Sequence, residues 1–71
     1  MNENDWIKDF KEKRIAYGLS QNKLAVEAGI SREHLNRLES GKVALTAKIK
    51  TQLSKALEKY NPESLLTMLF D

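Results

Sequence analysis

The chain of 71 residues contains no cysteine, one proline and three glycines. Without cysteine neither a disulfide framework nor a thiolate metal site can form, and a single histidine, His34, cannot build a zinc site alone. We therefore expect no metal and no cofactor. A domain this small buries only about 60% of the surface that its unfolded chain exposes, so a single domain over residues 1–71 must be stabilised by economical packing.

Long hydrophobic runs are also absent. No stretch approaches the roughly 20 apolar residues that span a bilayer, and the segment after Met1 lacks the apolar run of a signal peptide. We therefore expect a soluble, cytoplasmic protein that contacts no membrane. The residues also include no carboxylate pair, no reactive serine or cysteine framework and no glycine-rich phosphate loop, so we expect no enzymatic activity and no small-molecule substrate. On this view His34 is a partly exposed, non-catalytic imidazole.

The excess of positive charge is small: the formal net charge is +2, which alone is weak support for nucleic-acid binding. Its distribution says more. Residues 20–50 contain six Lys and Arg against three Asp and Glu, whereas the rest of the chain contains six against seven. The positive charge therefore lies in the middle of the chain, where contact with phosphates would require it, although a chance excess of three charges is the alternative.

What the chain does have is apolar residues at helical spacing, which predicts an all-α fold of about five short helices and no sheet. The first helix begins at a cap, Asn4 or Asp5, and stops at Gly18, which suits a left-handed C-cap. The second is capped by Ser20 and ends at Gly29.

Three more helices are expected in the second half of the chain. The third is capped by Ser31 and ends near Gly41, and the fourth is capped by Thr46. Proline is favoured at the first position of a helix, so Asn61 and Pro62 open a fifth helix that continues through the leucines at positions 65, 66 and 69.

Residues 20–41 carry the motif with the clearest mechanical meaning. Ala25 is small where two helices must cross closely, and Gly29 supplies the positive φ that turns one helix into the next at a steep angle. Leu35 and Leu38 share the inner side of the following helix. Other small or apolar residues tie the pair to the core, namely Leu24, Ala28 and Ile30. This pattern predicts a helix-turn-helix.

The outer face of the third helix consists of residues that can reach base edges: Arg32, Glu33, Asn36 and Arg37. A positive charge is unfavourable at a helix N-terminus, so Arg32 indicates contact with DNA, most sharply a bidentate pair with guanine. Glu33 and Arg37 are four apart and can pair with each other; alternatively, Glu33 accepts from a cytosine amino group. Asn36 can bond adenine or remain a solvated amide.

The spacing resembles the phage-repressor helix-turn-helix, the group of the lambda and 434 repressors and the Xre-like regulators. The residues that carry the resemblance are Arg14, Gly18, Leu19, Ser20, Gln21, Leu24, Ala25, Gly29, Ile30, Ser31, Leu35, Leu38, Glu39 and Gly41. The resemblance implies a compact five-helix, lambda-repressor-like domain that binds double-stranded DNA sequence-specifically and regulates transcription. It also implies that Arg14 pairs with Glu39, and that Gln21 touches a phosphate and braces Arg32.

Phosphate contacts that fix the register are expected from Gln21, Ser31, Ser40, Lys42 and Thr46. Lys48 and Lys50 are either phosphate partners or solvated lysines. After Gly41 the chain departs from many Xre-like members, which have a proline there. The sequence of this stretch is closer to that of the lambda repressor loop. Val43 stands where the family contacts DNA. It cannot donate a hydrogen bond, so the contact is lost or becomes an apolar one with a thymine methyl.

The last residues leave two alternatives open. Five apolar residues fall within six positions, too many for one helical stripe to bury, and they are Leu65, Leu66, Met68, Leu69 and Phe70. We expect this tail to fray or to meet a second copy or a following domain. The tail and residues 6–14 also resemble the N-terminal module of replication-initiation proteins of conjugative transposons and plasmids, whose nicking domain would follow. An antitoxin-like module that presents its final helix to a protein partner is the other alternative.

Overall fold

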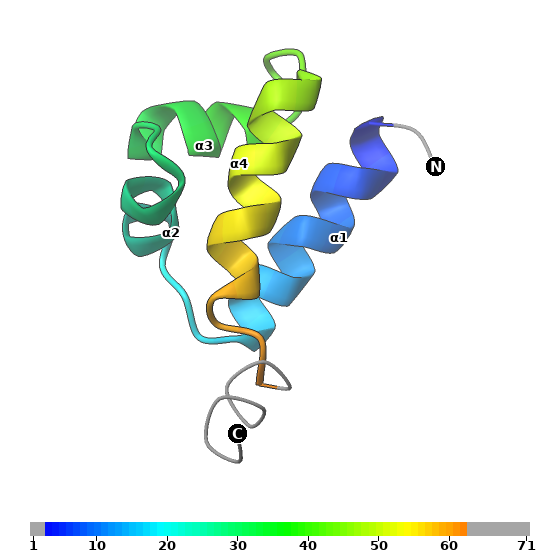
Figure 1. The fold of residues 1–71 in the computed structure, drawn as a ribbon. Helices are drawn as coiled ribbons and strands as arrows, with labels where there is room; N and C mark the ends of the chain where they lie inside the picture. Colours follow the sequence, from blue (N-terminus) through cyan, green and yellow to red (C-terminus); the bar gives the residue numbers. More distant parts are fainter. Residues whose placement is uncertain (1–2, 63–71) are drawn as a thin grey trace.

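The computed structural model describes residues 3–62, which form four α-helices and no strands (Figure 1). The helices are α1 (Glu3–Ala16), α2 (Gln21–Ala28), α3 (Arg32–Glu39) and α4 (Ala47–Glu58). The all-α prediction is therefore confirmed for this part of the chain. Asn61 and Pro62, which we expected to open a fifth helix, end the described range, and the rest of that helix and the apolar tail fall on residues outside it. None of the helices within residues 3–62 has both the length and the apolarity needed to cross a membrane.

Hydroxyl side chains begin three of the four helices, as predicted. Ser20 accepts a hydrogen bond from the backbone N–H of Lys23 at 3.0 Å, and Ser31 accepts one from His34 at 3.0 Å. Thr46 caps α4 in the same way at 3.2 Å. Each cap satisfies a backbone donor that the helix cannot, which is typically worth about 1 kcal/mol. The starts of α2, α3 and α4 are therefore set by local sequence.

The start of α1 corrects our prediction. Asn4 and Asp5 lie inside the first turn of a helix that already includes Glu3, so neither is its N-cap. Carboxylates at Glu3 and Asp5 favour this earlier start, because negative charge is stabilising near a helix N-terminus. The other end agrees with prediction: α1 stops at Ala16 and the backbone turns at Gly18 with φ +74°.

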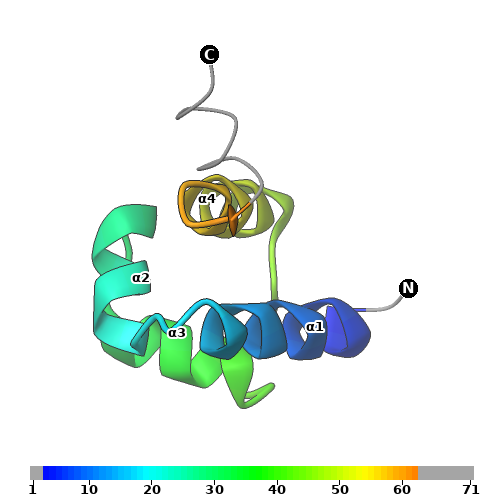
Figure 2. The ribbon, with the colours of Figure 1, turned by 90° about the horizontal axis from the view of Figure 1, so that it is seen from below.

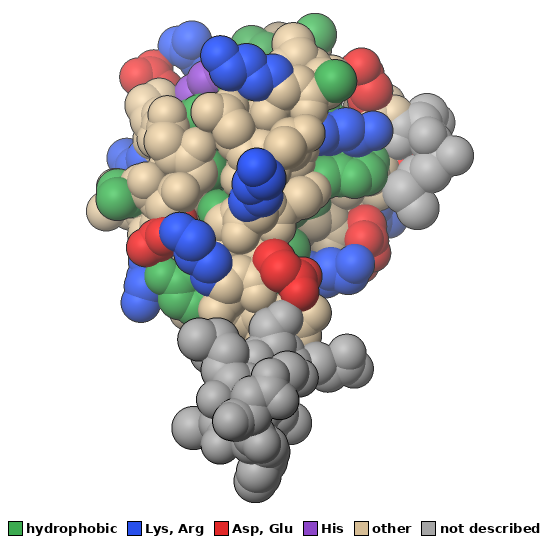
Figure 3. Space-filling model, in the orientation of Figure 1, with side chains coloured by type: hydrophobic (Ala, Val, Ile, Leu, Met, Phe, Trp, Pro, Cys, Tyr) green, Lys and Arg blue, Asp and Glu red, His purple; other side chains and the backbone are tan. Residues whose placement is uncertain are grey.

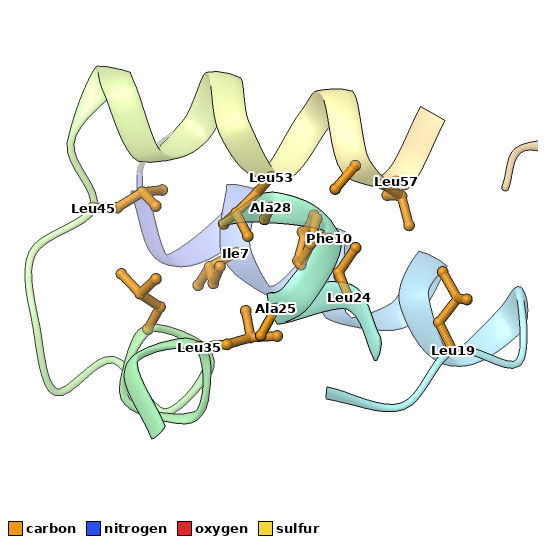
Figure 4. Packing of buried hydrophobic residues seen from close by; sticks show 12 residues of the cluster. Ile7, Phe10, Leu19, Leu24, Ala25, Ala28, Leu35, Leu45, Leu53 and Leu57 are labelled. Carbon is orange, nitrogen blue, oxygen red and sulfur yellow. The ribbon is translucent and has the colours of Figure 1, made fainter. Parts of the chain in front are cut away.

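The core is a single cluster enclosed by all four helices. In Figure 2, α4 lies opposite α1 and α3, with α2 along one edge, and the cluster takes its residues from all four of these helices and from the loops between them. Its largest fully buried side chains are leucines, Leu24, Leu35, Leu38 and Leu53. In Figure 4, Leu35 of α3 lies beside Ala25 of α2, and Ala25 is 1% exposed. The small side chain at Ala25 thus lets the two helices of the motif pack closely, as predicted.

A polar cluster on the surface joins α2 to the end of α4. Glu27 accepts hydrogen bonds from Lys59 Nζ at 3.0 Å and from the Tyr60 hydroxyl at 3.2 Å, and Lys23 Nζ lies 5.3 Å from the centre of the Tyr60 ring. The hydrogen bond and charge of Lys59, with the Tyr60 hydroxyl, hold the pKa of Glu27 below its usual range. These partners are 32 and 33 residues away in sequence, and we did not anticipate them.

The lowered pKa of Glu27 predicts a pH-dependent contribution to stability. Because its pKa is depressed on folding, the contribution is present above the unfolded value near 4.5 and is lost as pH falls through the lower folded value. We expect Glu27→Gln to destabilise the protein more at pH 7 than at pH 3, measured by urea unfolding. In the Lys59→Met protein, Glu27→Gln should show a smaller difference between the two pH values, because the largest cause of the lowered pKa is gone while the Tyr60 hydroxyl remains. An equal effect of Glu27→Gln at both pH values would contradict this assignment.

Candidate nucleic-acid interface

A buried ion pair fixes the end of α3 to α1. Arg14 Nε donates to Glu39 Oε2 at 2.8 Å and Arg14 Nη2 donates to Glu39 Oε1 at 3.0 Å, a two-pronged contact. The two side chains are 8% and 1% exposed. Arg14 Nη1 also donates to the backbone carbonyl of Leu19 at 2.7 Å. The pair that the family resemblance implied is therefore present, and it also holds the turn that leads into α2.

Gln21, at the first position of α2, extends this network to the surface of α3. Its amide nitrogen donates to Glu39 Oε1 at 2.9 Å and to Asn36 Oδ1 at 3.4 Å. The resemblance implied that Gln21 braces Arg32, whereas the structure pairs it with side chains one and two turns further along α3. Both amide hydrogens of Gln21 are engaged there, so a side-chain hydrogen bond to phosphate requires it to release one partner.

Arg32 is different from every other residue of the predicted reading face. It is the first residue of α3 and its side chain is exposed. Within residues 3–62 its guanidinium has neither a hydrogen-bond partner nor an ion-pair partner. A positive charge at this end of a helix is mildly destabilising, so Arg32 makes no favourable contribution to the stability of the fold through the helix dipole. The five N–H donors of Arg32 are therefore available to an external ligand.

Glu33 and Arg37 are paired with each other. Arg37 Nη2 donates to Glu33 Oε1 at 2.9 Å, one turn apart on the exposed side of α3. Their side chains are 75% and 55% exposed, so the pair contributes only about 0.3–0.5 kcal/mol. DNA can therefore separate them at small cost.

Three of the residues predicted to contact phosphate have hydroxyl groups, and these groups differ in the hydrogen bonds that they already make within the protein. Ser31 and Thr46 accept their capping bonds, so each retains its hydroxyl proton for a phosphate oxygen. Ser40 instead donates its proton to the carbonyl of Asn36 at 2.8 Å. It must break that bond before it can donate to DNA.

The lysines of this region also differ. Lys42 and Lys48 are exposed, as a phosphate partner must be. Lys50 Nζ lies 5.5 Å from the centre of the Trp6 ring, a cation–π contact that ties α4 to α1. Figure 3 shows Lys and Arg side chains at the end of the molecule formed by α3 and the loop before α4, with acidic side chains beside them at that end and lower on this face.

A sequence model of helix-turn-helix proteins matches residues 10–65, most of the chain. The chain belongs to the helix-turn-helix family, in its Xre and lambda-repressor-like branch. This is a family of DNA-binding regulatory domains, and a DNA-binding, regulatory type of function follows for this helix-turn-helix protein. No curated protein and no solved structure matches the chain significantly.

The helix-turn-helix also contains a shallow hollow that α3 forms with the loop after it. The hollow has a volume of about 300 Å³ and is lined by Ser31, Glu33, His34, Arg37 and Val43. The sequence pattern marked all of these residues, but it did not show that they surround one space. They come together because the loop folds back beside the first two turns of α3.

Proposed function

We propose that this helix-turn-helix protein is a transcriptional regulator that binds double-stranded DNA sequence-specifically, with α3 lying in the major groove. The observation that carries the proposal is Arg32, an exposed guanidinium at the N-terminal end of α3 that has no partner among the described residues 3–62. The first residues of a recognition helix are those that meet base edges in this type of domain. Arginine pairs there with O6 and N7 of guanine through two parallel hydrogen bonds.

The network behind α3 supports the proposal, because a reading helix must be held rigidly against the DNA. Glu39 and Arg14 anchor its last turn, and Gln21 connects that anchor to Asn36. With its oxygen facing Gln21, Asn36 presents its amide N–H groups outward. We infer that Asn36 donates to an acceptor such as N7 of a purine, which includes the adenine considered from sequence.

We assign the phosphate contacts that need no internal rearrangement to Ser31, Lys42 and Thr46. Gln21 and Ser40 join them only by exchanging internal hydrogen bonds for bonds to phosphate. Glu33 and Arg37 reach the groove as a pair whose net charge is zero, so the DNA meets no isolated carboxylate. Arg32 then supplies most of the base discrimination on α3.

Two substitutions separate base reading from phosphate contact. Arg32→Ala is expected to weaken binding to the preferred duplex by about 1–3 kcal/mol and to relax the preference at one base pair. Lys42→Ala is expected to weaken binding to all sequences alike and to lower the salt slope by about one unit. Fluorescence anisotropy titrations at several salt concentrations, on preferred and random duplexes, measure both effects. Equal losses on the two duplexes for Arg32→Ala would exclude a base-reading role.

The preferred duplex is obtained by selecting bound sequences from a random pool. We expect one enriched motif, whose loss in the Arg32→Ala protein identifies the base pair that this residue reads. If two copies bind together, the motif is a pseudo-palindrome with half-sites about 34 Å apart. Lys8→Ala, at an exposed position of α1, is a matched charge control that should leave the enriched motif unchanged. Failure of any motif to emerge would overturn sequence-specific binding.

A further inference from the structure

Val43 is a partly exposed apolar residue at the edge of the reading face. Within residues 3–62 three large hydrophobic side chains are exposed, Ile15, Val26 and Val43. Of these, only Val43 lines the hollow beside α3, where the other walls are polar: Ser31, Glu33, His34 and Arg37. An aliphatic side chain with no donor or acceptor therefore stands among residues that can contact DNA.

The loop holds Val43 in a defined place. On one side, the backbone N–H of Lys42 donates to the carbonyl of Arg37 at 2.9 Å, and Gly41 turns the chain with φ +74°. On the other side, Leu45 is 8% exposed and belongs to the core cluster. Val43 is thus fixed between a hydrogen bond to α3 and a buried leucine, so its apolar surface is already in position before a ligand arrives.

We propose that Val43 is a specificity-determining residue whose side chain contacts the C5 methyl group of a pyrimidine in the major groove, which is thymine in unmodified DNA. The methyl group of thymine is the apolar feature that the major groove presents at a base edge. The hollow of about 300 Å³ admits that edge, and the Glu33–Arg37 pair beside it offers no isolated carboxylate to repel the DNA. This inference rests on the proposed DNA-binding function and adds a preference for thymine beside the contacts of α3.

The test removes single methyl groups from the DNA. Each thymine of the duplex selected from the random pool is replaced, one at a time, by deoxyuridine, which keeps every hydrogen-bonding group. We expect one thymine per bound copy at which the unmodified protein loses about fourfold in affinity, the value for one methylene-sized group leaving an apolar contact. At that position Val43→Ala should lose less than about 1.5-fold, because the partner of the methyl group is gone.

Matched controls assign the effect to Val43 and to the methyl group. Val26→Ala, an exposed valine on α2 outside the hollow, should retain the full deoxyuridine effect. Placing cytosine and then 5-methylcytosine at the same position distinguishes methyl contact from recognition of the thymine O4. Methylation should restore affinity for the unmodified protein and leave Val43→Ala unchanged. Circular dichroism verifies the fold of each variant.

Two results overturn the inference and are separable from failure of the proposed function. If a preferred duplex is bound but no thymine shows a methyl effect that depends on residue 43, Val43 does not read a methyl group and sequence-specific binding stands. If Val26→Ala abolishes the effect as fully as Val43→Ala, the contact lies elsewhere. If no preferred duplex exists, the proposed function fails and this inference fails with it.

Discussion

Replacing Arg14 by methionine is expected to destabilise the protein by about 3–5 kcal/mol, because it leaves the carboxylate of Glu39 buried without a counter-charge. The side chain of Glu39 is 1% exposed and accepts two of the three hydrogen bonds that Arg14 donates. The third bond, to the carbonyl of Leu19, is lost as well. Urea unfolding followed by circular dichroism measures the difference. Since small domains have total stabilities of only about 5–15 kcal/mol, partial unfolding at room temperature is an expected outcome.

Two controls separate the buried pair from an ordinary surface pair. Lys13→Met breaks the exposed contact with Asp9 on the same helix, where the side chains are 55% and 50% exposed, and should change stability by less than about 1 kcal/mol. The double variant Arg14→Met with Glu39→Leu should recover much of the loss, since an apolar pair leaves no unpaired buried charge. If Arg14→Met were no more harmful than Lys13→Met, the pair would have no special role in stability.

Leu35→Ala is expected to destabilise the protein by about 2–5 kcal/mol. Leu35 is completely buried, and it attaches α3 to the core beside Ala25 of α2 (Figure 4). Truncation removes apolar contacts and leaves a cavity between the two helices of the motif, which the neighbouring backbone can close only in part. Thermal and urea unfolding give the loss in stability, and DNA titration of the remaining folded protein gives its effect on binding.

Conservative and exposed substitutions complete this comparison. Leu35→Met preserves volume and apolarity and should change stability by less than about 1.5 kcal/mol. Val26→Ala shortens a side chain that is 69% exposed on the neighbouring helix, so its effect should stay within about 0.5 kcal/mol. A loss for Leu35→Ala no larger than that for Val26→Ala would mean that Leu35 does not anchor α3.

Local signals in the sequence predicted the helices of the described region well. Ser20, Ser31 and Thr46 are caps that act over three residues, and Gly18 and Gly29 take positive φ values where helices end. These signals depend on the backbone within one turn, so they can be read without knowing the fold. Asn4 and Asp5 misled the prediction because several polar residues near a helix start can each serve as a cap or as a favourable charge in the first turn.

The predicted reading face of α3 shows which features could not be predicted from sequence. Arg32, Glu33, Asn36 and Arg37 could all be placed on one side of α3 from helical periodicity. Their availability to DNA could not be predicted in the same way. Glu33 and Arg37 form an ion pair with each other, and Asn36 accepts a hydrogen bond from Gln21. Arg32 has no hydrogen-bond or ion-pair partner within residues 3–62. Which of several feasible pairs forms depends on distances of a few tenths of an ångström between side chains.

The sequence by itself therefore determined that residues 3–62 are helical, where most of the helices in this range begin and end, and which residues share the outer face of α3. Periodicity, caps and glycines act within one turn of the backbone, so their effect is independent of the rest of the fold. Only the tertiary structure decided that Gln21 meets Asn36, that Lys50 lies over Trp6, and that the loop brings Val43 beside α3. Each of these depends on how separate elements pack against a shared core, a balance of contacts between distant residues that no local pattern encodes.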